Sequence, residues 1–181
     1  GGDPPTEPAE GPGELQHASE LVELASAIGG FSVGVAAQPG CHPLSLDPAS
    51  DRDHLAAKLS EADFAVTQFF FEASEYTDLV ADLAERGVDK PVLPGIMPVT
   101  TLRSVPRMAA MGAAVPAWMV DRLERADARG GADGVRHEGV VIATELCQQL
   151  MHSGVPGLHF YTLNRSSATR EIYSALGLAA P

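Results

Sequence analysis

Two kinds of apolar segment alternate along the chain. Short apolar runs with β-branched or aromatic residues predict buried strands, and apolar residues spaced three or four apart predict helices. We expect strands at 31–37, 64–71, 92–96 and 158–162. Helices are expected at 15–28, 51–62, 101–111, 116–128, 134–153 and 167–176, with one more that Ser74 caps and Gly87 ends. The glycine pair at 130–131 predicts a break between two of these helices.

Strands separated by helices favour parallel pairing with right-handed crossovers, which is an α/β fold. Residues 1–13 hold four prolines and four glycines, so we expect an irregular loop there. The sequence shows no short internal repeat, and we interpret residues 1–181 as a single domain. The first helix is expected from the spacing of its apolar residues, which include Leu21, Leu24 and Ile28. Trp118 and the phenylalanines at 69–71 are expected in the core, and the alternative is that such aromatic residues line a ligand pocket at the strand ends.

Gln68 is an amide near the end of an otherwise apolar strand. Burying an amide without a partner costs on the order of 1–3 kcal/mol, so its partner is either neighbouring backbone or a bound ligand. Residues that are polar or distort the backbone also end two other strands, namely Pro94-Gly95 and Asn164-Arg165. Polar residues at carboxyl strand ends are typical of the active face of a (β/α)8 barrel. A whole barrel has eight strands and about 250 residues, so four strands predict part of one, with two unpaired edges.

Composition narrows the possible functions. The 181 residues carry 24 acidic and 12 basic side chains, a net charge of −12, which argues against a general nucleic-acid or anionic-membrane surface. No apolar run reaches a membrane span of about 18 residues, and the first residues lack signal-peptide features, so cytoplasm is the expected location. Cys41 and Cys147 are expected to be free thiols. Nucleotide-binding glycine motifs and metal-ligand spacings are not found in the sequence.

Four motifs in order carry a family resemblance. They are AVTQFFF at 65–71, PGIMP at 94–98, PAWM at 116–119 and HFYTLNR at 159–165. In this order and spacing the chain resembles methylenetetrahydrofolate reductase from residue 2 to about residue 178. The resemblance implies a TIM-barrel oxidoreductase that reduces 5,10-methylenetetrahydrofolate to 5-methyltetrahydrofolate with NADH or NADPH, usually through FAD, in one-carbon and methionine metabolism. It covers the barrel from the end of the fourth strand onward.

The resemblance also implies roles for three site residues. Asp3 matches an aspartate beside the pterin and flavin that tunes the site electrostatically; by itself it would be a turn aspartate before proline. Gln68 matches a glutamine that contacts the pterin and, in the other half-reaction, the nicotinamide. Arg165 matches an arginine on the folate side, where a guanidinium suits the carboxylates of the glutamate tail. The alternative for Arg165 is a surface charge beside a helix.

For the flavin, the resemblance implies contacts from His42, Asp51, His54 and Lys58 around the phosphates and ribityl chain. The last three share one face of a predicted helix. A solvated helix face, and an ordinary loop histidine for His42, are the alternatives that the residues alone leave open.

Two positions depart from the family pattern. Gln38 stands where an aromatic residue lies near the nicotinamide, and Ala57 stands where flavin-binding members often have arginine. Loss of a ring removes a stacking surface and loss of a cation weakens phosphate binding, so both changes weaken the expected FAD site.

The family takes its general acid from a glutamate at the end of the first barrel strand, which the sequence does not contain. From these 181 residues alone we therefore expect little or no reductase activity. Two hypotheses follow: a reductase whose first half lies outside this sequence, or a non-catalytic half barrel that retains folate binding or serves in assembly. Homo-oligomers are expected in either case, because exposed strand edges favour association.

Overall fold

One parallel sheet organises the molecule. The computed structural model describes residues 15, 17–42 and 44–178. Its strands are β1 (Gly34–Ala37), β2 (Phe64–Phe69), β3 (Val92–Ile96) and β4 (His159–Phe160), in the order β1-β2-β3-β4, and every neighbouring pair is parallel. The predicted α/β class is confirmed, with four strand-helix units of a (β/α)8-type barrel.

Helices follow the strands as expected. They are α1 (Ala18–Ile28), α2 (Pro48–Glu61), α3 (Ala73–Glu85), α4 (Val105–Ala110), α5 (Ala117–His152) and α6 (Ser167–Ala175), with a 3₁₀ turn η1 (Leu102–Ser104) before α4. The cap assigned to Ser74 was wrong: Glu72 is the N-cap of α3, and its backbone N–H donates to Glu75 Oε1 at 3.1 Å in a capping box. A carboxylate two residues earlier therefore starts the helix.

Three strands are shorter than the sequence predicts. β1, expected from residue 31, begins at Gly34. β2 ends at Phe69, and β4 holds only His159 and Phe160. β4 pairs with Gly95 and Ile96, the last two residues of β3. Because β3 ends there, residues after Phe160 have no strand to pair with on that side. Apolar runs mark where a strand lies, but the length of the neighbouring strand decides how much of the run forms a ladder.

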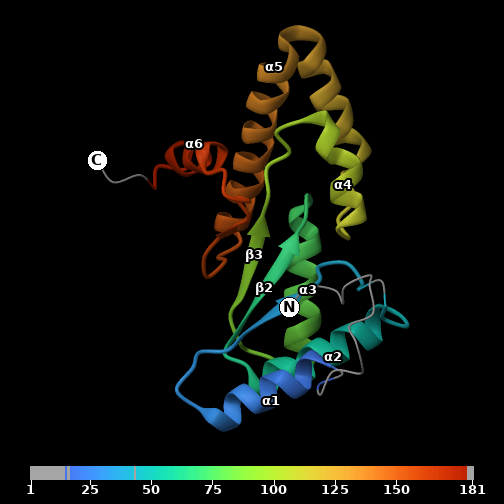
Figure 1. The fold of residues 1–181 in the computed structure, drawn as a ribbon, viewed down its shortest axis with the longest axis vertical. Coiled ribbons are helices and arrows are strands. Elements are labelled where there is room, and N and C mark those ends of the chain that lie inside the picture. Colours follow the sequence, from blue (N-terminus) through green and yellow to red (C-terminus); the bar gives the residue numbers. More distant parts are fainter. Residues whose placement is uncertain (1–14, 16, 43, 179–181) are drawn as a thin grey trace.

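Helix α5 consists of two arms that meet at Gly131. This glycine has φ 59° and ψ −148°, a backbone conformation that L side chains rarely adopt. The predicted break at 130–131 is thus confirmed. Figure 1 shows the two arms side by side as a hairpin that stands beyond the arrowheads of β2 and β3, close to α4.

The larger core lies on one face of the sheet. Helices α2, α3, α5 and α6 bury apolar side chains against it, including Leu59, Leu79, Leu150 and Ile172. Burial alternates along the strands, because successive side chains point to opposite faces. On the opposite face, Gly34 and Ala36 are exposed and Phe64 and Val66 are half-buried. The sheet is therefore covered on one side and open on the other within the described residues.

A smaller core fills the space between the strand ends and the α5 hairpin. Phe69 and Phe71 meet edge to face there, 6.0 Å between ring centroids, and Met108 of α4 packs with them. Phe70 points into the larger core and stacks on Tyr76. The three phenylalanines are buried as expected and join the two cores. Trp118 is 40% exposed, which corrects the expectation of burial, and its Nε1–H donates to Glu72 Oε1.

Helix α1 forms as expected, but most of its apolar face is exposed. Leu21, Leu24 and Ile28 are exposed, Ile28 by 68%, while Val22 is the buried residue of this helix. The spacing of apolar residues, three or four apart, correctly indicates that the helix has an apolar face. It does not say whether another part of the chain covers that face, and the described residues do not. Among the described residues, we also find no helix with the length and apolarity that crossing a membrane requires.

The free energy of unfolding should decrease at alkaline pH because of a buried thiol. Cys41 and Cys147 are both free, and burial raises the pKa of Cys147 to about 12. The unfolded thiol loses its proton near pH ~8.5 whereas the folded one keeps it, so stability is full below that pH and is lost as pH rises toward 12. We expect a loss of roughly 1 kcal/mol between pH 9 and pH 10 from this group. Urea unfolding across pH 7–10.5 checks this: the decline should be shallower in Cys147→Ala, and equal slopes would contradict it.

Candidate functional site

The carboxyl ends of the strands face α4 and the α5 hairpin (Figure 1). At this end lie the segment after β1, the last residues of β2, the turn after α4 and the segment after β4. In (β/α) barrels this is the end that carries the reactive groups. The positions named from the sequence that lie among the described residues fall at this end, or on α2, which follows the β1 segment.

A local irregularity between β2 and β3 shapes the site. The regular register at Val66 and Leu93 shifts before Phe69 meets Gly95, and the fully buried Thr67 fills the gap. Gly95 N–H donates to Thr67 Oγ1 at 2.8 Å, where a ladder bond would otherwise lie. Such a bulge changes the direction in which neighbouring side chains point. It lies one residue before Gln68.

Tyr161 closes this irregularity from the β4 side. Its hydroxyl donates to Thr67 O at 2.8 Å, and burial raises the pKa of Tyr161. A Cβ at Gly95 would lie 2.3 Å from Thr67 O and 2.7 Å from the Tyr161 ring, so only glycine fits between them. The sequence marked Gly95 as distorting the backbone, but nothing local in it indicates the contact with Tyr161.

Gln68 is half-buried at this end of β2. Its Nε2 donates to Met111 O at 3.2 Å, and its Oε1 accepts from Phe69 N–H at 3.1 Å. Of the two partners left open by the sequence, backbone is the one present. Both ends of the amide therefore have partners within the chain.

Arg165 follows a tight turn after β4. Its N–H donates to Thr162 O at 2.8 Å, and the two residues between them, Leu163 and Asn164, have φ of 46° and 63°. Left-handed backbone costs a leucine about 1–3 kcal/mol and is often found at functional sites. The exposed guanidinium of Arg165 has no partner among the described residues. Asp3, the remaining folate-side position, lies outside the described residues.

The positions expected around a flavin are largely engaged within the protein. Asp51 is buried and accepts from Ser45 Oγ at 2.7 Å and from Arg52 Nη1 at 3.2 Å. Lys58 Nζ donates to Ala36 O at 3.4 Å on the edge strand. Burial lowers the pKa of Lys58, and the nearby Asp51 carboxylate partly opposes that shift. His54 is exposed, with Nδ1 3.5 Å from Ser50 Oγ.

His42 lies in the segment after β1, where its Nδ1 accepts from Leu44 N–H at 3.2 Å. Ala57 is exposed on α2 and adds no cation. FAD needs cations for its diphosphate and a surface for its ring. Of the positions expected around the flavin, Lys58 offers a cation for the diphosphate, and Gln38 provides no ring where an aromatic residue was expected. The described residues do not by themselves fit the flavin.

Arg52 is the residue that the sequence analysis missed. Its buried guanidinium donates to three successive carbonyls after β1, those of Gln38 at 3.1 Å, Pro39 at 2.5 Å and Gly40 at 2.9 Å. It also pairs with Asp51 and with Asp82 of α3. An arginine among charged residues of a helix is usually solvated, so no local pattern indicates this role. Arg52 holds the backbone from which Gln38 extends to Gly112 O, 3.0 Å from its Nε2.

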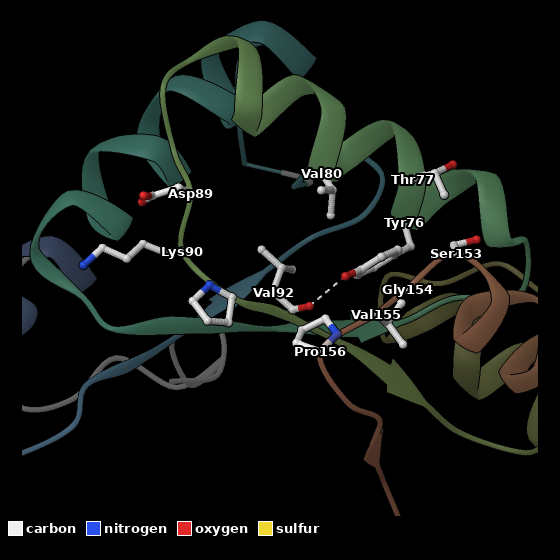
Figure 2. Close-up of a pocket in the computed structure, with 11 residues that line it drawn as sticks. Tyr76, Thr77, Val80, Asp89, Lys90, Val92, Ser153, Gly154, Val155 and Pro156 are labelled. Atoms are coloured by element: carbon white, nitrogen blue, oxygen red, sulfur yellow. Dashed lines mark hydrogen bonds between the residues drawn. The ribbon is translucent and has the colours of Figure 1, made fainter.

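A cavity of about 370 Å³ lies at the opposite, amino-terminal end of β3 (Figure 2). The Tyr76 hydroxyl on its wall donates to Val92 O at 2.8 Å. Lys90 and Asp89 extend along one side of it (Figure 2). This end of a barrel normally serves stability, and none of the positions named from the sequence lines the cavity.

The four strand-helix units and the polar residues at their carboxyl ends define the class: part of a (β/α)8-barrel protein. The methylenetetrahydrofolate reductase family model matches residues 1–177, and the chain belongs to that family. It is 34% identical over 173 residues to 5,10-methylenetetrahydrofolate reductase of Escherichia coli, covering 94% of this chain and 57% of the relative. Methylenetetrahydrofolate reductase 1 of Schizosaccharomyces pombe is 34% identical, over 98% of this chain and 30% of the relative.

A Caenorhabditis elegans protein described as a probable methylenetetrahydrofolate reductase (NADPH) is 36% identical over 82% of this chain and 22% of its own length. The chain thus spans little more than half of the bacterial relatives and less of the eukaryotic ones. A solved structure with TM-score 0.65 and 13% identity covers 91% of this chain and 59% of its own. That protein, uncharacterised and from Clostridium thermocellum, binds two copies of 5-methyl-5,6,7,8-tetrahydrofolic acid. The likeness supports the fold.

Proposed function

We propose that this chain is the folate-binding part of a methylenetetrahydrofolate reductase-type oxidoreductase, which converts 5,10-methylenetetrahydrofolate to 5-methyltetrahydrofolate with NADH or NADPH. The observation that carries the proposal is the Gln68 amide, placed by the β2–β3 irregularity at the carboxyl end of a strand in a chain of this family. An amide addresses the donor and acceptor edge of a pterin, or a carboxamide, without adding charge.

Arg165 is proposed for the folate tail. Its guanidinium is exposed, has no partner among the described residues, and follows a turn with left-handed backbone. A guanidinium holds a carboxylate through two parallel hydrogen bonds. The folate ligand of the Clostridium thermocellum protein with a similar fold supports the same ligand class. Asp3 remains our proposal for an electrostatic role beside the pterin.

Turnover is proposed for the longer protein of this type rather than for this part alone. The flavin positions His42, Asp51, His54 and Lys58 stay a prediction that FAD binding would test, and Asp51 is already engaged by Ser45 and Arg52. The choice between NADH and NADPH, a homo-oligomeric state and a cytoplasmic location likewise stay predictions.

A second function is a non-catalytic folate-binding or assembly module. The open face of the sheet, where Gly34 and Ala36 are exposed, favours it, because soluble proteins normally cover such a face. The engagement of Asp51 within the chain favours it too. NAD(P)H oxidation with 5,10-methylenetetrahydrofolate, with and without FAD, separates the two: substrate-dependent turnover by the chain alone excludes the module.

The folate-binding proposal predicts a loss of affinity in Gln68→Met. Methionine keeps the length of the side chain but removes the N–H donor and the carbonyl acceptor of the amide. The Kd of 5-methyltetrahydrofolate should therefore rise about tenfold, as for one or two lost hydrogen bonds. Calorimetric titration of the purified chain measures it. Gln148→Met, on the exposed side of α5, is the matched control and should leave the Kd unchanged. An equal Kd in both variants would contradict the assignment of Gln68.

A further inference from the structure

Two amides fasten the turn that follows α4. Gln38 Nε2 donates to Gly112 O at 3.0 Å, and Gln68 Nε2 donates to Met111 O at 3.2 Å. The donors stand near the carboxyl ends of neighbouring strands, and the acceptors are consecutive carbonyls. We propose that residues 111–112 form a strap across the ends of β1 and β2, that Gln38 positions this strap, and that folate binding at Gln68 displaces it. The inference rests on the proposed role of Gln68 in folate binding.

The strap lies between two anchored segments, because Ala113, which follows it, packs against the smaller core as Met108 does. Met108 is buried in the smaller core and anchors α4, whereas Met111 and Gly112 are exposed. The N–H groups of residues 111–113 bond to carbonyls of α4 itself. Among the described residues, the hydrogen bonds between the strap and the sheet side therefore come from Gln38 and Gln68. Gly112 has φ +92°, so the chain reverses there.

Folate and the strap compete for the same side-chain amide of Gln68. A ligand edge that forms two hydrogen bonds with the amide uses both Nε2 and Oε1. Without ligand, Nε2 donates to Met111 O and Oε1 accepts from Phe69 N–H. Nε2 carries two N–H groups, and a pterin acceptor that bonds to the one now held by Met111 O takes the place of that carbonyl. That exchange is nearly neutral, but Oε1 can accept a pterin donor through its second lone pair while it keeps Phe69 N–H, so binding gains about one hydrogen bond at Gln68. The stability of the closed strap then sets the fraction of binding-competent molecules, and thereby the apparent affinity.

Arg52 fixes the backbone of Gln38. Its own carbonyl accepts from Arg52 Nη1 at 3.1 Å, and the same guanidinium fixes the next two carbonyls of the segment. Because the backbone is already fixed, only the rotamer entropy of the side chain is lost when Gln38 bonds to the strap. This assigns a task to the amide at position 38, where the family resemblance leads one to expect an aromatic ring. Gln38 acts on the ligand through the strap, as a positioning residue.

Gln38→Met tests the strap without a ligand and with one. Removing the Nε2 donor should speed hydrogen exchange of the amides at 111–113 by about two- to tenfold, the effect of one hydrogen bond. The Kd of 5-methyltetrahydrofolate should fall by a similar factor, because more molecules are open. Gln148→Met, the matched amide removal on α5, should change neither quantity.

Gln68→Met separates this inference from the proposed function. In that background, Gln38→Met should still speed exchange at 111–113 but should no longer change the Kd. If Gln68→Met alone leaves the Kd unchanged, the proposed function fails, while exchange still reports on the strap. Unchanged exchange or weaker folate binding in Gln38→Met overturns the strap. Absence of folate binding in every variant overturns both proposals.

Discussion

Gly139→Ala should lower the free energy of unfolding by about 3 kcal/mol and Tm by about 10 °C. Gly139 is buried in the second arm of α5, where it packs directly on the backbone after β3. A Cβ there would lie 1.9 Å from Val99 O and 2.8 Å from Val99 C. Backbone yields far less readily than the end of a flexible side chain, so the hairpin must move away from the smaller core. Thermal and urea unfolding measure the loss.

Gly130→Ala is the matched control. Gly130 lies in the same helix, no atom lies within 4 Å of a Cβ built there, and its φ is not positive. Alanine favours helix over glycine by up to about 1 kcal/mol, so this variant should be neutral or slightly more stable. If the two alanine variants unfold at the same temperature, α5 does not pack on the Val99 backbone as described.

Local sequence signals predicted the secondary structure well, because each depends on residues within a few positions. Alternating apolar runs placed all four strands, and the break at Gly130 and Gly131 divided α5 correctly. Ser74 failed as a cap because Glu72, with Glu75 at the third helical position, competed successfully for the same helix start. The apolar spacing located helix α1 correctly, but periodicity describes one helix and not its neighbours, so it does not indicate that Leu21, Leu24 and Ile28 are exposed.

The site was less predictable because its contacts join distant parts of the chain. Gln68 stood out as an amide in an apolar strand, yet its partner Met111 lies 43 residues away. Tyr161 reaches Thr67 across 94 residues, and Gln38 reaches Gly112 across 74. The family resemblance named Gln68 and Arg165 but assigned no task to Arg52. Which backbone groups a buried guanidinium meets depends on the whole fold.

Arg52→Met should destabilise the chain by about 3–5 kcal/mol, the range for breaking a buried ion pair. The change leaves the carbonyls of residues 38–40 without their donor and removes the cationic partner of the buried Asp51 carboxylate. Methionine fills similar space, so lost hydrogen bonds rather than a cavity dominate. Urea unfolding gives the free energy, and hydrogen exchange of residues 38–42 shows whether the loss begins in this segment.

Arg136→Met controls for the removal of an arginine as such. Arg136 pairs with Glu171 through two bonds of 2.6 and 3.1 Å, but both groups are largely solvated, so the loss should stay below about 1 kcal/mol. Arg52→Lys should fall between the two methionine variants, since an ammonium keeps the charge but lacks the planar fork that spans successive carbonyls. Equal losses in Arg52→Met and Arg136→Met would mean that Arg52 is solvated. The backbone after β1 would then lack its support, and Gln38 would have no fixed base from which to hold the strap.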